Sequence, residues 1–128
     1  MIIVDSDVLI AHLRGYPPAR DWLHMARNAG PLSVSAVTVT EIAGGMRSGE
    51  RRDVWSLLSI CRVEPVTEGV ARRAGEFMRT YCRSHSSIGL GDYLIAATAD
   101  LLGANLATLN AKHFPMFEDL VAPFTWKP

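Results

Sequence analysis

The chain has 128 residues, of which 48% are hydrophobic and 20% charged, and its thirteen basic and thirteen acidic residues cancel to a formal net charge of +0. These values predict a single globular domain, residues 1–128, with one sizeable core, and they argue against a polycationic protein while leaving room for local basic patches. No apolar run approaches the ~18 residues of a membrane span, so we expect no membrane segment. The two cysteines fit no metal-binding spacing, which predicts free thiols. Because no basic leader precedes Asp5, we expect a cytoplasmic protein.

The chain opens with a short apolar run that ends at Asp5. A run of this kind predicts a strand buried on both faces, as in a parallel sheet. Ser6 or Asp7 is expected to cap a helix that continues to about Arg14 and is closed by Gly15. The next expected elements are a helix over 19–29, a strand over 31–35 and a helix over 38–46.

The second half of the chain continues this alternation. The apolar spacing of Val54, Leu57, Leu58 and Cys61 predicts a helix over 53–61. Residues 92–102 are apolar on nearly every side, which predicts a buried helix. The other expected elements are a strand over 62–66, an amphipathic helix over 67–83, a loop over 84–91, a strand over 105–108, a helical or turn segment over 110–117 and an edge strand over 121–125. Alternating strands and helices predict an α/β domain with a small parallel sheet and helices on both faces.

Three acidic residues occupy similar places in this pattern. Asp5 closes the first strand, Glu41 lies in the first turn of the helix after the second strand, and Asp92 begins the buried helix before the fourth strand. In a parallel sheet all three belong at the carboxyl-terminal edge, where ligands bind. Carboxylates gathered there repel one another unless some are protonated or a cation neutralises them. Oxygen ligands without His or Cys favour Mg²⁺ or Mn²⁺ over zinc, and such an ion commonly binds phosphate and activates water.

Each acid also has a simpler structural explanation. Thr38 and Glu41 have the Thr-x-x-Glu spacing of a capping box, which periodicity alone favours for Glu41. Asp7 suits a first-turn acid stabilised by the helix dipole. Asp92 fits a helix start, but an acid in an otherwise apolar helix is costly to leave unexplained. Asp100 lies about 12 Å further along that helix axis, too far to share an ion, and we interpret it as a solvated acid at the helix end.

Other polar residues are candidates for supporting roles. The hydroxyl of Ser6 would lie beside Asp5, where it could hydrogen-bond a metal-bound water. His113 follows the fourth strand and lies close to the predicted crevice. Arg14 and Arg47 are candidate contacts for a nucleic-acid backbone near the metal site, as are further arginines: Arg51, Arg52, Arg79 and Arg83. For any single arginine a solvated helix face is the simpler explanation.

Four segments, taken together and in order, form a recognisable set. They are Ile-Ile-Val-Asp-Ser-Asp-Val-Leu-Ile at the start, Ser-Val-Ser-Ala-Val-Thr-Val-Thr-Glu-Ile in the second segment, Gly-Asp-Tyr-Leu-Ile-Ala-Ala-Thr-Ala late in the chain, and then Leu-Ala-Thr-Leu-Asn-Ala-Lys-His-Phe. This set resembles a PIN-domain ribonuclease of the VapC toxin type. The likeness extends from Met1 to about Phe117, which is nearly the whole chain.

The resemblance implies a Mg²⁺- or Mn²⁺-dependent endoribonuclease with Asp5, Glu41 and Asp92 as its catalytic acids. Our hypothesis is that Asp5 and Asp92 hold the metal, while Glu41 binds it through water or helps to deprotonate the nucleophile. Ser6 matches the small hydroxyl residue that follows the first acid in the family. Many members carry a fourth acid shortly after the last core strand, and here that position is Asn110. The resemblance also implies a homodimer, a cognate antitoxin lying over the active-site groove, and structured RNA such as transfer RNA as the target.

Two alternatives remain open from the sequence. An apolar strand followed by Asp5-x-Asp7 also begins haloacid-dehalogenase-like phosphotransferases, in which the first Asp is the nucleophile. Those enzymes need a lysine beside the phosphate, and Lys112 is the only lysine away from the carboxyl end. The second alternative is a PIN-like module that binds a partner or RNA without catalysis, and the missing fourth acid is the feature in its favour.

Overall fold

Short aliphatic segments form the strands of one parallel sheet. The computed structural model describes residues 1–127, and its sheet has the strand order β3-β2-β1-β4. The strands are β1 (Ile2–Val4), β2 (Leu32–Ser35), β3 (Arg62–Glu64) and β4 (Asn105–Ala107). Each neighbouring pair is parallel, so the prediction of a small parallel sheet is confirmed.

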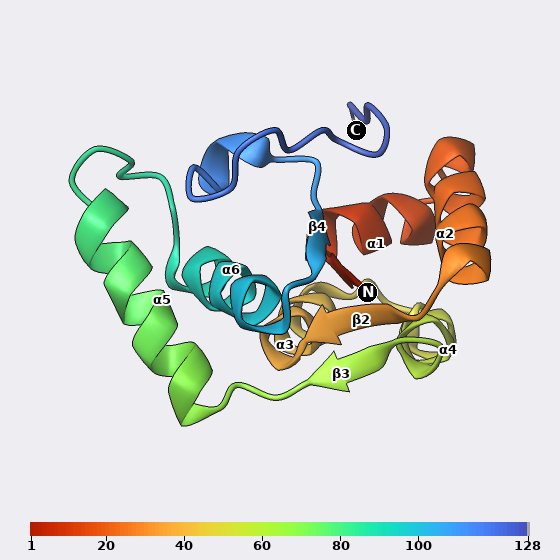
Figure 1. Ribbon diagram of the computed structural model, residues 1–128. Coiled ribbons are helices and arrows are strands. Elements are labelled where there is room, and N and C mark those ends of the chain that lie inside the picture. Colours follow the sequence, from red (N-terminus) through yellow and green to blue (C-terminus); the bar gives the residue numbers. More distant parts are fainter. Residues whose placement is uncertain (128) are drawn as a thin grey trace.

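Helices cover both faces of this sheet, as Figure 1 shows. They are α1 (Ser6–Leu13), α2 (Pro17–Ala29), α3 (Ala36–Gly45), α4 (Arg51–Ser59), α5 (Glu68–Tyr81) and α6 (Leu90–Leu102), followed after β4 by a 3₁₀ turn, η1 (Ala111–His113). Ile3 and Val4 of β1 are both fully buried but on opposite faces. Ile3 packs in the core beneath α5 and α6, and Val4 packs in the core beneath α1, α2 and α4. The first strand is therefore buried on both sides, as its continuous apolar sequence predicts.

The position of β1 in the sheet places Asp5 at the carboxyl-terminal edge. In the register of the sheet Val4 lies opposite Ala107, so β1 and β4 end side by side. The backbone N–H of Asp5 then donates to the carbonyl oxygen of Ala107 at 2.9 Å, which extends the pairing by one residue. Segments about a hundred residues apart in sequence are joined at this point.

The caps of two helices differ from the sequence prediction. Helix α1 is capped by Asp5, whose side chain accepts from the N–H of Ser6, rather than by Ser6 or Asp7. Helix α3 begins at Ala36, two residues before the predicted start, because the hydroxyl of Ser35 accepts from the N–H of Val37. Thr38 consequently lies inside α3 and caps nothing at its start, so the capping-box interpretation of Glu41 is wrong.

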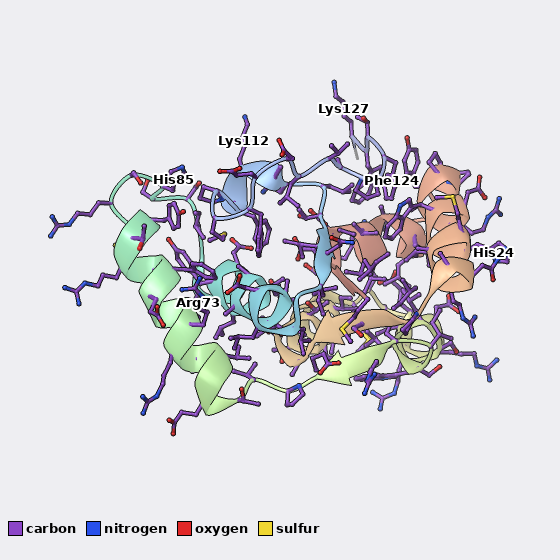
Figure 2. The ribbon with its side chains drawn as sticks, viewed as in Figure 1. His24, Arg73, His85, Lys112, Phe124 and Lys127 are labelled. Atoms are coloured by element: carbon purple, nitrogen blue, oxygen red, sulfur yellow. The ribbon has the colours of Figure 1, made fainter. Side chains whose placement is uncertain are left out.

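The carboxyl-terminal segment does not form the predicted edge strand over 121–125. Its attachment is aromatic instead: the hydroxyl of Tyr16 donates to the carbonyl of Thr125 at 2.7 Å, and the Tyr16 ring lies 5.9 Å from Phe124 and 6.5 Å from Trp126 between centroids. Figure 2 shows Phe124 directed from this segment toward α1 and α2. Pro123 has no N–H to donate to a strand partner, which disfavours ladder pairing here.

Two further sequence predictions concern the environment of the chain. Cys61 and Cys82 are both free thiols, as expected. Over residues 1–127 the structure contains no helix with the length and apolar character needed to cross a membrane.

Candidate active site

The three acids predicted from the sequence gather where the strands end. Asp5 follows β1, Glu41 lies in the second turn of α3, and Asp92 lies in the first turn of α6. Burial is the main cause that raises the pKa of Asp5, and the charge of Asp92 raises it further. Burial is the main cause that raises the pKa of Glu41, and the charges of Asp5 and Asp92 raise it further. Mutual pKa effects of this kind arise between carboxylates that lie near one another, and Oε2 of Glu41 lies 3.6 Å from the position of a Cβ on Gly91, the residue before Asp92.

Asp5 is the most deeply placed of the three, with only 6% of its surface exposed. One carboxylate oxygen, Oδ1, accepts from the N–H of Ser6 at 2.8 Å, and the other, Oδ2, accepts from the hydroxyl of Thr108 at 2.8 Å. Both hydrogen bonds favour the ionised form, but burial outweighs them and the net pKa is raised. Each oxygen keeps a lone pair beyond the one that is hydrogen-bonded, so the carboxylate is fixed in orientation and still able to bind a ligand.

Asp92 is held from two sides. Its Oδ2 accepts from the N–H of Gly89 at 3.1 Å, which satisfies a free donor at the start of α6. The same oxygen lies 3.1 Å from Nδ1 of His113 in η1. Asp92 therefore performs the capping role that its position at a helix start suggests, while the contact with His113 confirms that this histidine lies at the crevice.

Glu41 stands at the exposed rim of the group. A side-chain hydrogen bond with Ser6 lowers its pKa, against the larger effects that raise it. Ser6 thus acts on two of the acids: its backbone N–H donates to Asp5, and its side chain lowers the pKa of Glu41. The expectation that Ser6 lies beside the acids agrees with this geometry.

Thr108 is a site residue that the sequence analysis missed. It is 1% exposed, directly follows β4, and donates its hydroxyl hydrogen to Asp5. The same oxygen accepts from the N–H of Asn110 at 3.1 Å, which joins the Asp5 carboxylate to the loop after β4. A threonine at the end of the strand that pairs with β1 was the available signal, but the strand order needed to use it is not visible in the sequence.

Asp7 contacts the loop after β4, in addition to its place in the first turn of α1. It is in the first turn of α1, as expected, but its Oδ2 also accepts from the N–H of Leu109 at 3.1 Å. Burial, followed by the charge of Asp5, raises the pKa of Asp7 to about 7. Its other oxygen, Oδ1, is buried without a hydrogen-bond partner among residues 1–127. Asp7 therefore ties α1 to the loop after β4 and adds to the unfavourable concentration of negative charge.

The remaining predicted residues lie around this centre with other contacts. Asn110 precedes η1 and connects to the site through its backbone N–H. The guanidinium of Arg14 forms an ion pair with Glu50, which ties the end of α1 to the turn before α4. Arg47 is exposed, and its backbone N–H donates to the same Glu50. Contacts of Arg14 and Arg47 with RNA stay predictions.

The donor set suits a divalent cation of the hard, oxygen-preferring kind. Asp5 and Asp92 are the residues that could hold it, since their carboxylates are fixed by hydrogen bonds and their charges repel. Oδ1 of Asp7, buried and without a hydrogen-bond partner among residues 1–127, is an oxygen of this group that the protein leaves unpaired. Among residues 1–127 no group of three or more His, Cys, Asp or Glu side chains is placed so that it could hold a metal ion. Water or substrate oxygens would therefore complete the coordination.

Comparison with known proteins adds to this geometry. A family model described as PIN domain matches residues 2–118. The chain belongs to the PIN domain family. Within this family it is of the VapC type: it is 65% identical over 124 residues to Ribonuclease VapC10 of Mycobacterium tuberculosis, covering 97% of this chain and 93% of that protein. It is also 38% identical to Ribonuclease VapC19 of the same organism, over 97% of this chain and all of that protein.

Solved structures agree with the PIN domain fold. A toxin-antitoxin complex from Klebsiella pneumoniae contains a chain that superposes with a TM-score of 0.78 at 24% identity, covering 97% of this chain and 98% of that one. At this level of identity the match supports the α/β fold and no finer property. The acids of this chain therefore stand on the PIN domain fold.

Proposed function

We propose that this PIN domain protein is a Mg²⁺-dependent endoribonuclease, in which Mn²⁺ can substitute, and that it is the toxin of a toxin-antitoxin pair. The observation that carries the proposal is the meeting of Asp5, Glu41 and Asp92 at the carboxyl-terminal edge of the sheet. The VapC-type relatives are named as ribonucleases, which supports hydrolysis of RNA phosphodiester bonds. Structured RNA such as transfer RNA is the proposed substrate class.

Each residue of the site has a role in this proposal. Asp5 and Asp92 would hold the metal, and Glu41 would accept a proton from the attacking water or contact the metal through water. When bound, Mg²⁺ supplies positive charge that lowers the pKa of a coordinated water and stabilises the charge on the phosphate. Thr108 and the N–H of Ser6 keep the Asp5 carboxylate in one orientation, at 2.8 Å each. Outer contacts of this kind commonly tune metal affinity.

The alternative phosphotransferase hypothesis needs a lysine beside Asp5, and the structure of residues 1–127 does not place one there. It requires a cation beside the Asp5 nucleophile, and Lys112 was the candidate. Figure 2 shows Lys112 directed outward from η1 into solvent, and the residue is exposed. Metal-dependent hydrolysis therefore accounts better for the three gathered acids.

The comparison with solved structures also bears on the protein partner of this chain. The matching chain from Klebsiella pneumoniae belongs to a toxin-antitoxin complex, which supports a cognate antitoxin for this chain as well. We further propose that the antitoxin lies over the acids, that the toxin is a homodimer, that Arg14 and Arg47 contact the RNA once it is bound, and that the protein acts in the cytoplasm.

Purified toxin freed of antitoxin tests the catalytic proposal. With a pool of transfer RNA we expect discrete cleavage products in Mg²⁺, none in excess EDTA, and recovery on addition of Mg²⁺ or Mn²⁺. Products are resolved on a denaturing gel and their ends are mapped by sequencing. Cleavage that persists in EDTA would contradict metal dependence, and intact RNA under all conditions would favour the non-catalytic binding module.

A further inference from the structure

Gly91 occupies a place where a side chain would press on helix α3. It is the second residue of α6, directly before Asp92. A Cβ at this position would lie 3.3 Å from Cγ1 of Val37 and 3.6 Å from Oε2 of Glu41, both on α3. The first contact is tighter than side chains normally accept, and the second would put a methyl group directly against the carboxylate.

Backbone conformation does not account for this glycine. The glycines with positive φ are elsewhere in the chain, at Gly15, Gly49 and Gly103, so Gly91 has a helical conformation that alanine adopts readily. Glycine in a helix is less favourable than alanine, because it loses more backbone freedom on folding. What the missing side chain provides is space between α3 and α6.

Glu41 is the group that occupies this space. No residue among 1–127 forms a salt bridge with it, and the cap of α3 is Ser35 rather than Thr38. A free glutamate side chain has many rotamers and would lose that freedom only where contacts restrict it. The Glu41 carboxylate lies beside the start of α6, because its Oε2 is 3.6 Å from the position that a Cβ of residue 91 would take, and the charge of Asp92 raises its pKa.

We propose that Gly91 is a positioning residue of the active site: its lack of a side chain lets the Glu41 carboxylate lie against the first turn of α6, beside Asp92. This inference rests on the proposed function, since it assigns Glu41 a place near the metal. A methyl group at position 91 presses on Val37 and pushes the carboxylate of Glu41 outward, or covers the side of it that faces the acids.

The test is a double-mutant cycle of Gly91→Ala with Glu41→Gln, measured as Mn²⁺ affinity by calorimetry and as the Mg²⁺ concentration for half-maximal RNA cleavage. Outer-shell changes at metal sites typically weaken binding by about 10–100-fold, and we expect G91A to lie near the lower end, about tenfold. In the E41Q background the same change should have no further effect, because coupled residues lose additivity. Val37→Ala removes the tightest contact, so V37A/G91A should recover part of the loss.

Gly75→Ala is the matched control, because Gly75 lies in α5 with no atom near its absent Cβ. G75A should bind Mn²⁺ and cleave RNA as the parent does. Equal Mn²⁺ affinity and half-maximal Mg²⁺ concentration in G91A and the parent would overturn the inference, as would a full additional loss in the E41Q background. A parent protein that neither binds Mn²⁺ nor cleaves RNA overturns the proposed function itself, and the inference with it.

Discussion

Replacing Asp5 with asparagine is expected to reduce RNA cleavage to background while the domain stays folded. The amide oxygen of asparagine can still accept from the N–H of Ser6 or the hydroxyl of Thr108, which both reach this side chain at 2.8 Å. The negative charge that would hold the metal is lost, and so is its repulsion with the neighbouring acids. Cleavage is measured in Mg²⁺, and folding by circular dichroism and thermal unfolding in its absence.

Asp92→Asn should give the same result, because the asparagine oxygen can still accept from Gly89 at the start of α6. Asp100→Asn is the matched control on the same helix: Asp100 pairs with Arg73 at 2.8 Å, at the other end of α6. D100N makes the same charge change and should cleave RNA at the parental rate. Parental cleavage by D5N or D92N would show that the site is elsewhere.

The second large effect concerns pH and the metal-free protein. In the folded state the pKa of Asp7 is raised from 3.8 to about 7, and those of Asp5 and Glu41 are raised as well. The folded protein therefore holds protons that the unfolded chain releases, so these groups favour folding fully at low pH and lose that contribution as pH rises. For Asp7 the loss falls between about pH 4 and pH 7. We expect the melting temperature in EDTA to fall by several degrees from pH 5 to pH 8.

Mg²⁺ should reverse this trend, because an ion that binds only the folded state stabilises it. The increase in melting temperature on adding Mg²⁺ should be larger at pH 8 than at pH 5, where protons compete for the carboxylates. Burial lowers the pKa of His12, which acts in the opposite direction, so stability is compared with Asp7→Asn to isolate the acids. D7N should show a smaller loss between the two pH values. A pH profile identical to that of the parent would contradict the electrostatic account of Asp7.

The sequence predicted best those features that depend on local pattern. The apolar run before Asp5 indicated a strand buried on both faces, and Ile3 and Val4 are fully buried on opposite sides. The acid in the apolar segment 92–102 indicated an unusual site at the start of that helix, and Asp92 does lie with Asp5. In both cases a residue out of keeping with its surroundings was the informative signal.

Features that depend on the three-dimensional contacts were predicted less well. The spacing of Thr38 and Glu41 fits a capping box, but Ser35 starts the helix earlier, so the competing cap decides the outcome. Thr108 gained its role only from the pairing of β4 with β1, which no local pattern reveals. The same holds for Gly91, whose function depends on a side chain fifty residues away.

The central claim is that Asp5, Glu41 and Asp92 form one pocket for a divalent ion, and a crystal structure of the protein grown with Mn²⁺ tests it most directly. Anomalous scattering identifies the ion without assumptions about activity. We predict one strong peak in direct contact with the carboxylates of Asp5 and Asp92, with Glu41 facing it, and no such peak in crystals of D5N. Mn²⁺ bound at other acids, or the three carboxylates directed to separate parts of the surface, would contradict the account.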